Sequence, residues 1–139
     1  PFYNECIETI KGIILDNDPN LAIYLYNSIK KIASFLDMET NIILSSTLEK
    51  NNNLKSEEKV LAICKIVDAT EYYNAIGGQE LYSKQEFEEK GIKLRFLKAN
   101  LQEYSQFKNE FVSGLSIIDV LMFNGKKKTI EMLKDFELV

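Results

Sequence analysis

Residues 92–98 read Ile-Lys-Leu-Arg-Phe-Leu-Lys, and this stretch has the clearest strand pattern in the sequence. The apolar residues Ile92, Leu94 and Phe96 are separated by basic residues, so one face of the segment is apolar and the other is charged. A period of two is that of a β-strand, whose successive side chains point to opposite faces of a sheet. The stretch therefore predicts a half-buried strand.

The residues just before this strand predict a short helix and a second strand. Ser83 and Glu86 have the spacing of a capping box, and Gly91 provides a helix stop. Residues 71–75 (Glu-Tyr-Tyr-Asn-Ala) form the second candidate strand, which ends at a pair of glycines. The order strand, helix, strand is typical of an α/β sheet with parallel neighbours.

Further upstream, a helix and another strand are predicted. Ser56 precedes two glutamates, which favours a helix start because a serine caps free amides and acids suit the positive end of the helix dipole. Apolar residues over 60–67 supply that helix with a buried face. Residues 41–46 (Asn-Ile-Ile-Leu-Ser-Ser) are a short apolar run that ends in hydroxyls, and they predict a buried strand.

Both ends of the chain are predicted to be helical. The first helix has isoleucines at helical spacing and ends before Asp18-Pro19. The second begins near Leu21, and its apolar stripe consists of Leu25, Ile29, Ile32 and Leu36. A strongly apolar helix is expected from Ser116 to about Asn124-Gly125, and a last helix over residues 127–136.

Together these elements predict an α/β fold in which N-terminal helices are followed by a small, partly parallel sheet flanked by helices. Residues 1–139 are expected to form a single domain, with a helical segment over 1–38 and an α/β segment over 39–139. Hydrophobic residues make up 45% and charged residues 27%, which is the profile of a globular protein.

Composition excludes several classes of function. The net charge of −4 repels phosphate backbones, so no nucleic-acid partner is expected. No apolar stretch approaches the ~20 residues that span a bilayer, and no signal peptide is visible. The chain begins Pro1-Phe2-Tyr3, so we expect a fragment of a longer protein or one trimmed at its N-terminus.

The chain has no histidine, which excludes Ser-His-Asp and Cys-His catalysis within it and leaves no imidazole for zinc. We therefore predict no metal site. Cys6 and Cys64 lie among apolar neighbours, so we expect free thiols in a reducing cytoplasm rather than a disulfide.

Several motifs in the second two-thirds of the chain resemble a known family. They are Ile43-Leu44-Ser45-Ser46, Asn74-Ala75-Ile76-Gly77-Gly78 with Leu81-Tyr82, Phe87 with Gly91-Ile92, and the run over 115–124 preceded by Tyr104, Gln106 and Phe111. In order and spacing they resemble the C-terminal portion of the WbqC-like protein family. The resemblance covers about residues 40–139 well and the first helices loosely.

Two family features are missing from the chain. The family's N-terminal strand, with its Gln-Pro-aromatic turn, is absent. Ser56 and Lys59 stand where the family often has a glycine and an arginine, and an ammonium does not replace a guanidinium fork in binding an anion.

Ser45 and Ser46 are candidate ligand-binding residues because they end a predicted strand, where ligands of α/β sheets bind. With Thr47 and Lys50 they also resemble the Ser-Ser-Thr-x-x-Arg phosphate loop of nucleotidyltransferases, with the lysine in the arginine position. The alternative is that these hydroxyls only turn the chain.

Gly77 and Gly78, with Asn74 and Tyr82 on either side, form a second candidate site. Two glycines can bring backbone amides close to an anion. A tight turn between a strand and a helix explains the pair equally well.

Asp119 lies in an apolar run, where a carboxylate could act as a base or orient a substrate. Asp119 follows Ser116 by three residues, so it could instead reach back to the capping amide. Gln106 is the second candidate catalytic residue. Tyr104 and Asn124 are polar residues that a ligand could use, whereas Phe107 is expected to pack in the core or at its rim.

The resemblance implies a cytoplasmic bacterial protein of polysaccharide gene clusters. Its first functional interpretation is an enzyme domain of surface-polysaccharide (O-antigen) biosynthesis that transfers an acyl, aminoacyl or nucleotidyl group to a nucleotide-activated sugar. The expected partner is a nucleotide-sugar or another anionic small molecule, and the cofactor is unknown. The second interpretation is a non-catalytic binding or assembly module, with the helix over 115–123 at the interface of a homo-oligomer.

Overall fold

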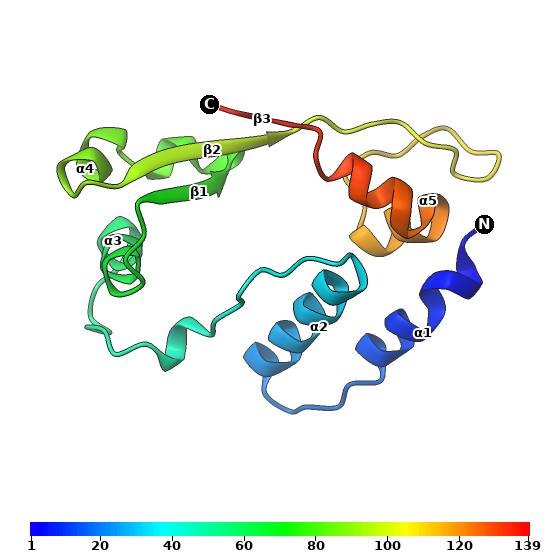
Figure 1. The fold of residues 1–139 in the computed structure, drawn as a ribbon, viewed down its shortest axis with the longest axis horizontal. Helices are drawn as coiled ribbons and strands as arrows, with labels where there is room; N and C mark the ends of the chain where they lie inside the picture. Colours follow the sequence, from blue (N-terminus) through cyan, green and yellow to red (C-terminus); the bar gives the residue numbers. More distant parts are fainter. The chain divides into compact units, whose positions relative to one another are not determined.

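The computed structural model describes all residues, 1–139, and the chain divides into two compact units (Figure 1). Unit 1 consists of residues 1–42 and 101–135, and unit 2 of residues 43–100 and 136–139. The chain therefore passes from one unit to the other three times. The single domain over 1–139 stays a prediction.

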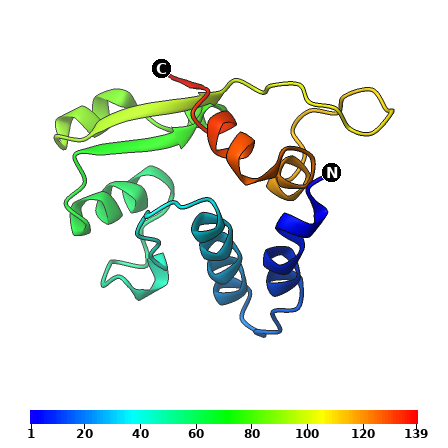
Figure 2. The same cartoon turned by 45° about the vertical axis from the view of Figure 1, so that its right-hand side comes forward.

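Unit 1 contains three helices, which are α1 (Tyr3–Ile14), α2 (Leu21–Phe35) and α5 (Ile117–Met132). Figures 1 and 2 show α1 and α2 side by side, and α1 also packs against α5. The core of the unit is formed by Cys6 and Ile10 of α1, Leu36 after α2, and Leu121 of α5. The predicted N-terminal helices are confirmed.

The predicted apolar stripe of α2 is only partly correct. Leu25 and Ile29 are 47% and 56% exposed, whereas Ala33 and Leu36 are buried. The helix packs on the core of unit 1 with its C-terminal half, to which Ile32 also contributes. Periodicity identifies an apolar face but does not show how much of its length is covered.

The α5 helix has a break at Gly125, as the sequence predicts. Gly125 has φ 71° and ψ 175°, a combination that is open to glycine and essentially closed to other residues. The next amide, Lys126 N, donates to Glu5 Oε1 of α1 at 3.1 Å. A side chain at position 125 would place its Cβ 2.5 Å from Phe2 Cδ1. The break is thus the point where α1 meets α5.

Unit 2 is a three-stranded sheet with helices and turns around it. Its elements are η1 (Ser45–Thr47), α3 (Ser56–Ile66), β1 (Glu71–Ala75), η2 (Ile76–Leu81), α4 (Lys84–Glu89), β2 (Lys93–Ala99) and β3 (Phe136–Leu138). β1 pairs with β2 in parallel, and β3 pairs with β2 in antiparallel orientation. The predicted small, partly parallel sheet after N-terminal helices is confirmed.

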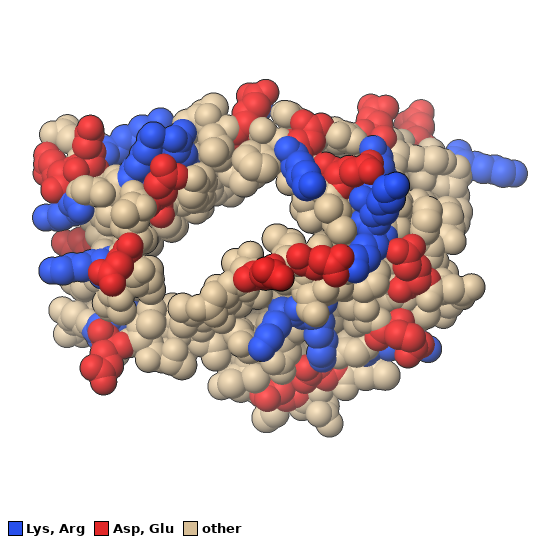
Figure 3. Space-filling view, in the orientation of Figure 1, with Lys and Arg blue, Asp and Glu red and all other residues tan.

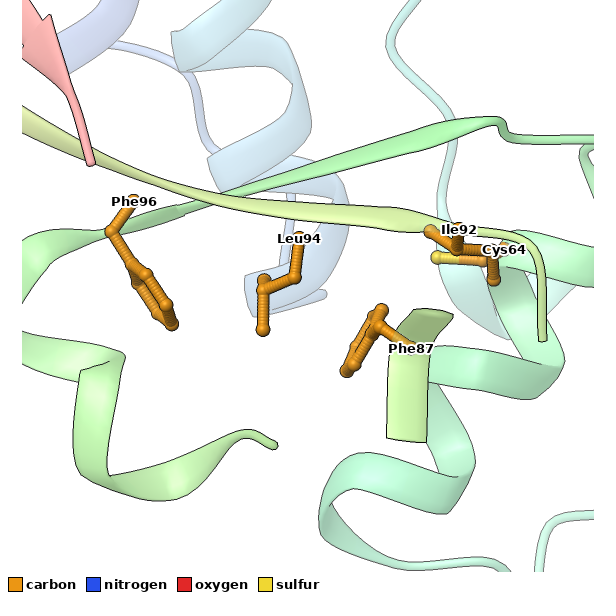
Figure 4. Close-up of a cluster of buried hydrophobic side chains, with 5 residues drawn as sticks. All are labelled: Cys64, Phe87, Ile92, Leu94 and Phe96. Atoms are coloured by element: carbon orange, nitrogen blue, oxygen red, sulfur yellow. The ribbon is translucent and has the colours of Figure 1, made fainter. Parts of the chain in front are cut away.

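The core of unit 2 lies on one face of β2 (Figure 4). Leu94 and Phe96 point to this face, where they meet Phe87 of α4 and, with Ile92, Cys64 of α3. Their alternation with Lys93 and Arg95 is the pattern that predicts the strand. The predicted cap of α4 is also present, since Ser83 Oγ accepts from Glu86 N at 3.3 Å.

The predicted strand over residues 41–46 is wrong. Residues 45–47 form the 3₁₀ turn η1, and residues 41–44 have no strand pairing. Both the amide and the hydroxyl of Thr47 donate to Leu44 O, at 2.9 and 2.8 Å. Local bonds of this kind compete with a sheet ladder, and they explain why the short apolar run does not extend into one.

Two predicted helix boundaries also differ. The last helix ends at Met132 rather than at Phe136, which begins β3. Ser56 starts α3 without capping it and has a positive φ of 44°. No helix of the chain combines the length and the apolar character that a membrane span requires.

Candidate functional site

The structure brings Asn74 and Gly78 together at the carboxyl end of β1. Asn74 Oδ1 accepts from Ala75 N at 2.8 Å, and a Cβ on Gly78 would lie 2.8 Å from Asn74 Nδ2. Gly78 therefore allows the close approach of the Asn74 amide, whereas a Cβ on Gly77 would meet no atom within 4 Å. The carboxyl ends of parallel strands are where ligands of α/β sheets bind.

Tyr82 is part of an aromatic cluster in unit 2. Its ring meets the edge of Tyr72 at 5.9 Å and of Phe87 at 6.1 Å between centroids. Burial, and then the neighbouring Tyr82, raise the pKa of Tyr72 to about 12. The Tyr82 ring thus packs against the core, next to the turn that carries the glycines.

Ser45 and Ser46 lie on the exposed turn η1. Lys50 Nζ donates to Ser45 O, which closes this turn on itself. No hydrogen bond joins η1 to the Gly77–Gly78 turn, and Figures 1 and 2 show the two turns at different ends of unit 2. The structure does not gather the serines and the glycines into one place.

The candidate catalytic residues Asp119 and Gln106 do come together, in unit 1. Asp119 Oδ2 accepts from Tyr104 Oη at 2.7 Å and from Gln106 Nε2 at 3.1 Å. Burial, and then the hydrogen bond to Asp119, raise the pKa of Tyr104 above its ordinary value. Tyr104 therefore stays a neutral donor to the carboxylate near neutral pH.

The hydrogen bonds of Asp119 go to the loop before α5 and not to the amide of Ser116. Ser116 caps α5 by itself, because its Oγ accepts from Ile118 N at 3.2 Å. Asp119 Oδ2 carries both bonds from the loop, and Oδ1 accepts none from the protein. One oxygen of this carboxylate is thus held in place, while the other makes no hydrogen bond within the protein.

Gln106 stabilises the loop before α5 through its side-chain hydrogen bonds. It is 7% exposed, its Nε2 also donates to Val112 O at 3.1 Å, and its Oε1 accepts from Val112 N at 2.8 Å. Both ends of the amide are therefore engaged within the loop and with Asp119. Gln106 positions Asp119, and its own polar atoms are occupied.

Asn124 and Phe107 differ from what the sequence suggests. Asn124 Nδ2 donates to Val120 O at 2.9 Å, within its own helix. Phe107 is 78% exposed, with its ring against Phe123 at 4.8 Å between centroids, whereas the sequence predicts a place in the core or at its rim. Its position in a polar stretch, between Gln106 and Lys108, is the signal that it is exposed.

The structure contains no metal site, and the face in Figure 3 has no large patch of one charge. Four cavities of about 560, 570, 600 and 300 Å³ are lined by residues other than the candidates above. No group of three or more cysteine and carboxylate side chains could hold a metal ion. Figure 3 shows Lys and Arg interspersed with Asp and Glu on the face in view.

Comparison with known proteins gives one match. No curated protein and no solved structure matches the chain. The family described as the WbqC-like protein family matches residues 1–131, so the match includes the N-terminal helices, where the motifs give only a loose resemblance. Because this match covers nearly the whole chain, the chain belongs to the WbqC-like protein family.

Proposed function

We propose that the chain is an enzyme domain of bacterial surface-polysaccharide (O-antigen) biosynthesis that transfers an acyl, aminoacyl or nucleotidyl group to a nucleotide-activated sugar. The family resemblance suggests the polysaccharide setting. The observation that carries the group-transfer step is the Asp119 carboxylate, with one oxygen fixed by Tyr104 and Gln106 and the other without a hydrogen bond in the protein.

In this proposal Asp119 is the general base. Its Oδ1 accepts the proton of a sugar hydroxyl or amine as that group forms a bond to the carbonyl carbon or phosphorus of the activated donor. The bond between that atom and the donor's leaving group breaks, and the leaving group departs with the electron pair. A positioned base of this kind contributes about 10²–10⁴ in rate. Tyr104 and Gln106 keep the carboxylate oriented for it.

A separate anion site, within unit 2 and independent of the Asp119 network of unit 1, is proposed at the turn after β1. The amides of Gly77 and Gly78 and the Asn74 side chain lie there, beside Tyr82. Ser45 and Ser46 lie on a separate turn and are the alternative contact for an anion. A cofactor is not part of the proposal.

The test is a thermal-shift screen with UDP-, GDP- and dTDP-sugars, the free nucleotides, and acyl or aminoacyl donors. A ligand that binds only the folded protein at 100 times its dissociation constant adds about 2.7 kcal/mol of stability. Binding that persists in Asp119→Asn while transfer falls at least about 100-fold would support the proposal. Unchanged transfer in Asp119→Asn would refute the role of the base.

The matched control is Asp68→Asn. Asp68 is an exposed aspartate with a positive φ of 50°, a conformation that asparagine adopts readily. The substitution removes one carboxylate charge outside the Asp119 network, so transfer should stay at the level of the unaltered protein. An equal loss in both variants would mean that charge alone, and not the position of Asp119, matters.

A second candidate function is a non-catalytic binding or assembly module that forms a homo-oligomer. The observation in its favour is the stripe of Leu21, Leu25 and Ile29 on α2, which are 69%, 47% and 56% exposed and lie four residues apart. The run over 115–123 suits an interface less well, because Leu121 is buried within unit 1. Light scattering gives the molar mass of the purified protein and of the Leu25→Glu variant. An oligomer that dissociates in Leu25→Glu would favour this function.

A further inference from the structure

Phe107 has a backbone conformation that its side chain does not favour. Its φ is +56°, in the left-handed region that bulky residues rarely occupy. The ring is 78% exposed, so burial of the side chain does not offset the unfavourable backbone. Strained backbone at a residue whose side chain stays mostly exposed is characteristic of functional positions.

The loop around Phe107 is held firmly. The neighbouring Gln106 is buried and binds both Val112 and Asp119. Gln106 and Asn109 form an antiparallel bridge, which makes Phe107 the first residue of a tight turn. The position of the exposed ring is therefore fixed by its neighbours.

The ring of Phe107 is linked to Asp119 through two other aromatic rings. It meets Phe123 edge-on at 4.8 Å, and Phe123 in turn lies 6.1 Å from Tyr104, whose hydroxyl binds Asp119. Asp119 and Phe123 are four residues apart on α5 and so share one helix face. Phe107 also follows Gln106, whose side chain binds Asp119, so the exposed ring and this carboxylate belong to one connected group of side chains.

We propose that Phe107 is the stacking surface for an uncharged pyranose ring, whose apolar face lies on the phenyl ring while a hydroxyl donates to Asp119 Oδ1. The negative face of an aromatic ring attracts the weakly positive C–H groups of such a ligand. This inference rests on the proposed function and assigns the site to the sugar that accepts the transferred group.

The local charge favours an uncharged ligand. Residues 101–119 carry three carboxylates, Glu103, Glu110 and Asp119, and one ammonium, Lys108. An excess of negative charge disfavours the phosphates of a nucleotide. The site therefore fits the sugar ring and not the nucleotide part of an activated sugar.

The experiment measures binding of methyl β-glucopyranoside and methyl N-acetyl-β-glucosaminide by saturation-transfer NMR and titration. Phe107→Gly removes the ring and relieves the left-handed backbone, so affinity should fall about tenfold while the melting temperature stays the same or rises by up to about 4 °C. Phe107→Asn, which also tolerates this backbone, should give the same result. Leu81→Ala, at a 70% exposed position in unit 2, should leave affinity unchanged.

Three outcomes would overturn the inference. The first is no saturable binding of either glycoside up to about 20 mM, beyond the millimolar range of weak ligands. The second is equal affinity in Phe107→Gly and the unaltered protein. The third is a fall in melting temperature of more than about 4 °C in both Phe107 variants, which would make the ring a packing element.

The result is separable from the test of the proposed function. Glycoside binding that depends on Phe107 upholds the inference even if no nucleotide-sugar binds and no group is transferred. Conversely, transfer that depends on Asp119 but not on Phe107 upholds the proposed function and refutes the stacking surface.

Discussion

Gly125→Ala tests whether the contact between α1 and α5 depends on the break at Gly125. The new Cβ would lie 2.5 and 2.8 Å from two carbons of the Phe2 ring and 2.9 Å from Glu5 Oε2. It would also force alanine into φ 71°, ψ 175°. Both effects act on the same place, so we expect a large loss of stability from a single methyl group.

The magnitude is the sum of two contributions. A non-glycine residue in this region of backbone space costs about 1–3 kcal/mol. Displacing Glu5 weakens its bond to Lys126 N at the start of the second half of α5, for about 0.5–1 kcal/mol at an exposed site. The expected loss is therefore about 1.5–4 kcal/mol, or a fall in melting temperature of about 5–14 °C for a chain of this size.

The assay is urea unfolding followed by circular dichroism at the helix band. Gly77→Ala is the control, because a Cβ there meets nothing within 4 Å and its φ is not positive, so its stability should change by less than about 1 kcal/mol. In the double variant Phe2→Ala, Gly125→Ala, the loss of unfolding free energy should be smaller than the sum of the losses in the two single variants, because the clash with the ring is removed. A loss below about 0.5 kcal/mol in Gly125→Ala would refute the reasoning, since it falls short of the least cost of the backbone conformation alone.

Three further predictions concern other parts of the chain. Asn20→Ala should cost about 1 kcal/mol in urea unfolding, because the Asn20 Oδ1 accepts from two amides of α2 at 2.9 and 3.3 Å. The hydrogen bond from Lys31 lowers the pKa of Asp16 in the folded state. The pair therefore stabilises the protein above the ordinary pKa of an aspartate, and this stability is lost as pH falls below about 4. In Lys31→Met the melting temperature should fall less steeply with acid. Tyr72 has its pKa raised to about 12 by burial, so a spectrophotometric titration of the phenolate absorbance should show a late step that Tyr72→Phe removes.

The sheet of unit 2 was predictable because its signals are local. Strand alternation over 92–98, the Ser83 cap and the stop at Gly91 each depend on residues within one element. The break at Gly125 was predictable for the same reason, since Asn-Gly interrupts an apolar run. Local chemistry and tertiary structure agree at these positions.

The failures share a dependence on partners distant in sequence. Residues 41–46 have the composition of a strand but no neighbouring strand to pair with. Conversely, β3 is only three residues long, and it forms because Phe136–Leu138 meets the free edge of β2. Composition cannot indicate whether a sheet edge is available.

The candidate site shows the same limit. Asp119 was identified as unusual because it is a carboxylate in an apolar run, but its partner Tyr104 lies fifteen residues earlier in a loop without repeating structure. The conformation of that loop depends on the hydrogen bonds between Gln106 and Val112, and no sequence pattern predicts these bonds. Phe107 was expected to be packed because aromatic residues usually are, and its positive φ is visible only in the structure.

The antiparallel pairing of β2 with β3 has a consequence for the topology of the chain. Ala99 is paired with Phe136, so the last residue of β2 and the first residue of β3 are direct neighbours across the sheet. Residues 101–135, which belong to unit 1, therefore occupy the position of a hairpin loop. A two-residue Asn-Gly turn in place of residues 100–135 could leave unit 2 as one continuous polypeptide. In topological terms, the segment that carries Tyr104, Gln106 and Asp119 is an insertion into a β-hairpin.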